Sequence, residues 1–174
     1  MPRSPPASKA VDPIIRYSHA DWAEAAMMAS VMKGQRAALW PAVAVVVVLA
    51  ATCYPHVPGW ELALMVVVSM VVTVVRLRFV QGYERLAKTD RIDVQLSYLH
   101  RYRGFWILNG VAWGMWPLLF YGRLPAAATV ACWMLTAGVG GVAIASMSAH
   151  LRATRAFLMS FLLSLAISVG LAFV

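Results

Sequence analysis

Long apolar tracts alternate with short polar segments along the chain, and each tract is about as long as a membrane-crossing helix. A bilayer core about 30 Å thick is crossed by about 20 helical residues, because each residue adds about 1.5 Å along the axis. The pattern therefore predicts an all-α integral membrane protein with five transmembrane helices, over residues 37–54, 60–75, 105–121, 126–149 and 156–174.

Short turns rich in proline and glycine join two pairs of these predicted helices. Residues 55–59 follow the first helix, and residues 122–125 follow the third. Connections this short place consecutive helices side by side and antiparallel.

The remaining segments flank or connect the membrane domain, residues 37–174. Residues 1–17 are rich in proline and polar side chains and are expected to be disordered. Residues 18–36 predict a helix with apolar side chains on one face, which either lies on the inner leaflet or packs against the cytoplasmic ends of the spans. Residues 76–104 are expected to form a cytoplasmic connector, in which a helical extension breaks near Thr89.

Composition agrees with a membrane protein. The chain is 61% hydrophobic and 13% charged, and its mean hydropathy is +0.71. A soluble domain of this size is nearer half apolar and a quarter charged.

The basic residues are distributed asymmetrically between alternate loops. All of the 15 Lys and Arg residues except Arg123 lie in the loops on one side of the predicted spans. Because cytoplasmic loops carry the excess of Lys and Arg, this pattern places the N-terminus in the cytoplasm and both short turns outside. It also accounts for the net charge of +8, so the expected partner is the lipid bilayer and not nucleic acid.

Five spans from a cytoplasmic N-terminus leave the C-terminus outside. The sequence stops at Val174 within an apolar tract. We therefore expect a chain truncated before a sixth helix.

Aromatic residues near the ends of the predicted spans are expected at the two lipid–water interfaces. The outer set is Tyr54, Trp60, Trp116 and Tyr121, and the inner set is Trp40, Phe105, Trp106 and Phe157.

No catalytic or metal-binding spacing is present. The four histidines are scattered, and the two cysteines form no ligand set with them. We therefore expect no catalytic residue, metal or cofactor in this segment. The predicted spans also hold no deep ionisable residue, which argues against an ion-coupled transporter.

A few polar and aromatic residues are weak candidates for ligand binding. Asn109 carries an amide that lipid cannot satisfy, so it faces another helix or a ligand. Trp113 could border a slot, and His150 and Arg152 form a basic cluster at the inner ends of the last two spans. Close helix packing is expected at five small residues: Gly110, Gly114, Gly138, Gly140 and Gly141.

Two motifs carry a family resemblance. The sequence Asn109-Gly110-Val111-Ala112-Trp113-Gly114 is followed by a glycine-rich span and then by His150-Leu151-Arg152-Ala153-Thr154-Arg155-Ala156-Phe157. Over residues 76–174 the chain resembles the multi-pass N-terminal membrane regions of bacterial sensor histidine kinases and GGDEF diguanylate cyclases. The resemblance implies a non-catalytic sensory input module in the bacterial inner membrane, dimeric through its parent protein. That parent would be a histidine kinase or, alternatively, a diguanylate cyclase.

Two other functions are compatible with the residues. The chain could be a transporter half-unit, or a small structural membrane protein that is complete as it stands.

Overall fold

The computed structural model describes residues 19–88, 92–102, 104–148 and 150–173. The N-terminal segment expected to be disordered lies outside the described residues, as does Val174. Every secondary-structure element in the described residues is a helix: α1 His19–Ala37, α2 Leu39–Cys53, α3 Gly59–Ala87, α4 Ile92–Arg101, α5 Gly104–Gly114, α6 Pro117–Phe120, α7 Ala126–Met147 and α8 Leu151–Ala172.

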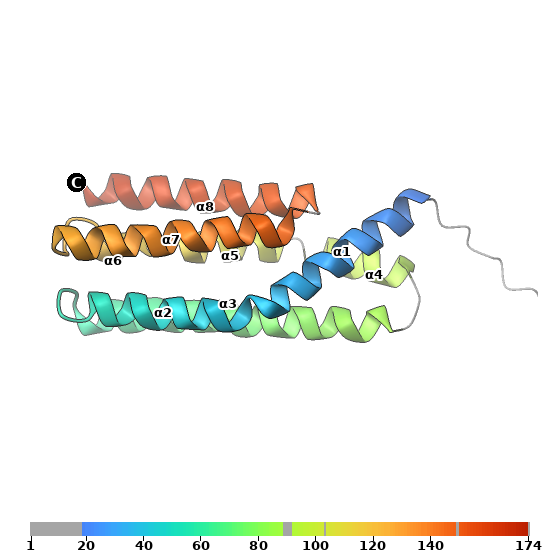
Figure 1. Ribbon diagram of the computed structural model, residues 1–174, viewed down its shortest axis with the longest axis horizontal. Helices are drawn as coiled ribbons and strands as arrows, with labels where there is room; N and C mark the ends of the chain where they lie inside the picture. The colour runs from blue at the N-terminus through green and yellow to red at the C-terminus, as the bar shows by residue number, and fades with distance from the viewer. Residues whose placement is uncertain (1–18, 89–91, 103, 149, 174) are drawn as a thin grey trace, which may run out of the picture.

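The helices form a bundle with a smaller group of helices at one end. Figure 1 shows α2, α3, α7 and α8 running side by side, with α5 and α6 following one another in the same direction. At the end away from the two short turns, α1 crosses the bundle obliquely beside α4 (Figure 1). The axes of α1 and α2 meet at 42°.

The prediction of five full-length transmembrane helices is wrong in its count. Three helices, α3, α7 and α8, are long and apolar enough to cross a membrane, and a fourth span is counted if the bent pair α1–α2 is one unit. The helix α2 alone has 15 residues and is about 22 Å long, less than a bilayer core of about 30 Å. The predicted span 105–121 is divided between α5 and α6.

Proline explains the break between α5 and α6. Pro117 has no backbone N–H, so it cannot continue the helical hydrogen bonds of α5. The backbone N–H of Leu118 donates to the carbonyl of Met115 at 3.1 Å, a tighter turn than that of an α-helix.

The helix α3 continues about three turns beyond the predicted end of the second span. It has 29 residues and is about 44 Å long, so it exceeds the thickness of a bilayer core. Its buried side chains continue at helical spacing past the apolar tract, and this buried stripe consists of Leu62, Met65, Ser69, Val72, Arg76, Phe79, Val80 and Tyr83.

Two glycines bring α5 and α8 into close contact. A Cβ atom on Gly110 would lie 2.4 Å from the backbone oxygen of Phe157, and one on Gly114 would lie 2.5 Å from that of Phe161. Small residues at these positions let the two backbones approach, as in other membrane helix pairs.

Two of the five glycines predicted to pack closely make no close contact within the described part of the chain. A Cβ on Gly138 or Gly141 would meet nothing within 4 Å, so neither residue is needed for close packing. Gly140 is intermediate, because a Cβ there would lie 3.3 Å from the Phe161 ring.

The predicted aromatic belt is only partly correct. Trp40, Tyr54 and Trp60 are largely exposed, as interfacial rings would be. In contrast, four of the predicted belt residues are buried in the helix bundle and are core residues: Phe105, Trp106, Trp116 and Phe157.

An ion pair joins the turn before α7 to the beginning of α3. Arg123, in the turn before α7, forms an ion pair with Glu61 in the first turn of α3. Gly122 in that turn has a φ of 71°, a conformation that glycine adopts without the strain caused by a side chain.

Candidate functional site

A cavity of about 230 Å³ lies between α2 and α7, and residues of α5 line it as well. Its walls are mostly apolar, and its polar residues gather where α1 and α3 meet the bundle. The cavity is lined by Gln35, Ala38, Pro41, Ala42, Val45, Arg76, Asn109, Trp113, Met134, Leu135, Gly138, Val139, Val142, Ala143, Ser146 and Phe157.

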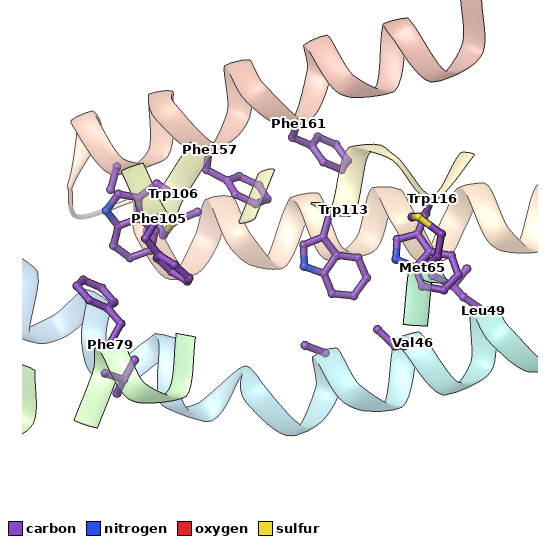
Figure 2. Close-up of a cluster of buried hydrophobic side chains, with 14 of the residues drawn as sticks. Val46, Leu49, Met65, Phe79, Phe105, Trp106, Trp113, Trp116, Phe157 and Phe161 are labelled. Carbon is purple, nitrogen blue, oxygen red and sulfur yellow. The ribbon is translucent and has the colours of Figure 1, made fainter. Parts of the chain in front are cut away.

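Two of the sequence-predicted candidates, Asn109 and Trp113, line this cavity together. Both are buried, and they stand one turn apart on α5. In Figure 2 the Trp113 ring projects from α5 toward α2, on the side where Val46 lies. The structure therefore places the Asn109 amide between helices and not against lipid.

Arg76 lines the same cavity, and its side chain is only 7% exposed. Its Nη2 donates a hydrogen bond of 3.0 Å to the backbone oxygen of Gln35 on α1, whereas its Nε has no partner. Within the described part of the chain no carboxylate pairs with this guanidinium. A buried cation is ordinarily paired, because loss of hydration disfavours an isolated charge.

Gln35 contributes a second unsatisfied group. Its Nε2 donates to the hydroxyl of Ser146 on α7 at 3.2 Å, while its Oε1 has no partner. One end of the cavity therefore holds the Arg76 guanidinium, which has no carboxylate partner, and the Gln35 Oε1, which accepts no hydrogen bond.

The sequence analysis missed Arg76, because it assigned the residue to the cytoplasmic connector. The expectation of no deep ionisable residue concerned the predicted span 60–75, and Arg76 lies one residue beyond it, in the part of α3 that the sequence analysis did not predict. A signal was present in the sequence: Phe79, Val80 and Tyr83 follow Arg76 at intervals of three, four and seven, which places all four on one helix face.

The other two candidates, His150 and Arg152, lie in a different cavity, of about 470 Å³. His150 is the N-cap of α8, and its Nδ1 accepts a hydrogen bond from the Ala153 N–H at 3.1 Å. Its Nε2 lies 3.4 Å from the Glu24 carboxylate of α1, and the Arg152 guanidinium lies 4.0 Å from the same oxygen. The basic cluster therefore joins α1 to α8.

A third group, of aromatic rings, connects α3 with α4 and α5. The Phe79 ring stacks on Tyr98 at 5.5 Å between centroids and contacts Phe105 and Trp106 at 5.2 and 5.7 Å. Figure 2 shows Phe79 projecting from α3 toward the pair on α5. The Tyr98 hydroxyl also donates to the Phe79 carbonyl at 3.1 Å, and burial raises the pKa of this phenol.

The sequence analysis also missed a stripe of serines on α8. Ser160, Ser164 and Ser168 recur every four residues, and they lie along α5. Their four-residue spacing is the sequence signal of a small-residue packing face.

Among the described residues, no group of three or more His, Cys, Asp or Glu side chains is arranged to hold a metal ion. Comparison of the chain with protein families, curated proteins and solved structures gave no match.

Proposed function

We propose that the chain is a membrane-embedded, non-catalytic sensory input module of a bacterial signal-transduction protein, a sensor histidine kinase in the first instance. The observation that carries the proposal is the continuity of α3. One residue of this helix, Arg76, lines the cavity, and Tyr83 lies two turns further along the same helix, in contact with α1 and α4.

The contacts of Tyr83 support a mechanical connection. Its hydroxyl lies 3.5 Å from the Ala25 carbonyl of α1 and 3.4 Å from the Gln95 side chain of α4. The stacking of the Phe79 ring on Tyr98 adds a packed contact between the same helix and α4. A ligand that favours one position of α3 would therefore move α1 and α4, which is how differential binding biases a two-state element.

The proposal includes an orientation. The N-terminus and the α1–α4 end lie in the cytoplasm and the two short turns lie outside, as the positive-inside rule favours. In this orientation the short helices α2 and α5–α6 complete the bundle between the longer spans. The parent protein would be a homodimer in the bacterial inner membrane, and a GGDEF cyclase is the alternative output.

The experiment joins the chain to the dimeric output domain of a histidine kinase and measures phosphotransfer in membranes. Trp113→Ala should change kinase output at least severalfold, because it alters the cavity beside α3. Val130→Ala, at an exposed position of α7, is the matched control and should leave output unchanged. Unchanged output in both variants, with equal membrane levels, would count against a sensory role.

One observation favours a second function, that of a transporter half-unit. Arg76 is a buried cation in a helix long enough to cross a membrane, and such residues are typical of substrate pathways. Uptake of an anion into proteoliposomes that is lost in Arg76→Gln would favour transport over sensing.

A further inference from the structure

The polar end of the α2–α7 cavity lacks an anion. The Arg76 guanidinium is buried, makes one hydrogen bond to a neutral carbonyl and retains an unpartnered Nε–H. A guanidinium presents a planar array of N–H donors that fits a carboxylate or phosphate in a bidentate pair. The group that completes this site is therefore an anionic oxygen acceptor.

The depth of Arg76 along α3 suits a lipid-like head. Arg76 is 17 residues beyond Gly59, so it lies about 26 Å along the helix, near the inner boundary of a bilayer core about 30 Å thick. Ser146, which accepts from Gln35, lies at the corresponding end of α7. The cation therefore stands at the level where charged heads meet alkyl chains.

The rest of the cavity suits an alkyl chain. Its walls carry apolar side chains from α2 and α7, including Val45, Leu135 and Val139. Two further lining residues, Met134 and Val142, are 72% and 55% exposed, so the cavity opens sideways between the helices toward the lipid region. Its volume of about 230 Å³ is below the usual range for a whole drug-sized ligand, so it holds a head and part of one chain.

From these observations we propose that the cavity binds a single-chain anionic amphiphile. Its carboxylate or phosphate head pairs with Arg76, and its alkyl chain lies between α2 and α7. This inference deepens the proposed function, on which it rests for its biological meaning, by naming the class of ligand sensed. Binding is measured without any signalling readout, so the two proposals fail separately.

The experiment uses the full chain in phosphatidylcholine nanodiscs and photoreactive alkyl probes with mid-chain diazirines. Three probes differ only in the head: a carboxylate, a lysophosphatidate and an uncharged alcohol. Labelled residues are mapped by mass spectrometry. The expected result is saturable labelling of cavity-facing residues of α2 and α7 by one or both anionic probes, at least about tenfold above the alcohol. Which anionic probe labels identifies the head.

Two variants isolate the role of the buried charge. Arg76→Gln should reduce labelling about tenfold. Arg78→Gln makes the same change of charge at an exposed position on the same helix and should have no effect. If Arg76→Gln does not fold, the comparison of the three heads on the unaltered chain still decides the question.

Several outcomes would overturn the proposal. They are equal labelling by the alcohol and the anions, labelling spread over the lipid-facing residues of all the helices, and undiminished labelling in a folded Arg76→Gln variant. Competition by inorganic phosphate or acetate that matches competition by the unlabelled amphiphile would also contradict it, because the alkyl chain would then contribute nothing.

Discussion

The hydroxyl of Ser168 on α8 donates a hydrogen bond of 3.1 Å to the backbone carbonyl of Gly114 on α5. In a continuous helix this carbonyl would accept from the N–H of Leu118, which instead donates to Met115. Lipid offers no hydrogen bonds, so a backbone group freed by a helix break must find a partner in the protein. Ser168 is that partner for the break before Pro117.

Loss of this hydroxyl should destabilise the bundle. We expect Ser168→Ala to lower the free energy of unfolding by about 1–2 kcal/mol, because the Gly114 carbonyl would remain buried without a donor. Ser160→Ala is the matched control, since the Ser160 hydroxyl donates to carbonyls of its own helix. Unfolding in mixed micelles measures both, and equal stabilities would refute this role for Ser168.

Glycine substitutions should separate the tight α5–α8 contact from the looser α7 surface. Gly110→Ala is expected to destabilise by about 1–3 kcal/mol, because its Cβ would meet a backbone oxygen at 2.4 Å. Gly141→Ala has open space and should be neutral or slightly stabilising, through the better helix propensity of alanine. Thermal unfolding measures the stability of the two variants. A similar loss of stability in both would contradict the close α5–α8 packing at Gly110.

The α3–α4 contact should depend on pH through Tyr98. Burial, with a smaller contribution from the neighbouring Tyr102, raises the pKa of Tyr98 above the ordinary tyrosine value. The folded contact therefore keeps a proton that the separated phenol would release. Its stabilisation is complete below the ordinary tyrosine pKa and is lost as the pH rises through the raised value.

Hydrogen exchange in α4 at neutral and alkaline pH measures this dependence. The unaltered chain should lose protection in α4 on the alkaline side, and Tyr98→Phe should flatten that dependence. An unchanged alkaline profile in Tyr98→Phe would assign the effect to another group.

The contact between α2 and α7, toward the end of the bundle with the two short turns, can be tested with the two native cysteines. Cys53 on α2 and Cys132 on α7 are both buried, and each thiol is close enough to influence the other electrostatically. Oxidation by iodine should join them within one chain, so both thiols stop reacting with a maleimide after denaturation. In the control variant Cys53→Ser, Cys132 should still react with the maleimide after the same treatment. If both thiols of the unaltered chain still react after oxidation, α2 does not lie against α7 at these positions.

The helical regions follow from the apolar tracts and turn residues, but their exact lengths do not. Periodicity at Phe79, Val80 and Tyr83 could have extended α3, whereas the charges of Arg76 and Arg78 were read as the end of a span. Pro117 divides the predicted span 105–121 into α5 and α6, and the carbonyl of Gly114 that this frees is satisfied by Ser168. No local pattern predicts this contact between residues 54 positions apart.

The candidate site was half predictable. Asn109 and Trp113 stand out as a polar and an aromatic residue beside glycines, and both line the cavity. Arg76 and Gln35 reach the same cavity from α3 and α1, so their proximity depends on how the helices pack. His150 and Arg152 are seven and five residues before Phe157, yet they lie near Glu24 and line a separate cavity.

The central claim is that the packing of the cavity sets the position of α1 and α4. It is tested most directly by the distance between spin labels at the exposed positions Ala26 on α1 and Ala137 on α7, in nanodiscs and with the native cysteines replaced by serine. Trp113→Ala should shift the distance distribution by about 2 Å, as expected for a helix displacement, and the added substitution Tyr83→Phe should reduce that shift. Identical distance distributions for the unaltered chain and for Trp113→Ala would contradict the account.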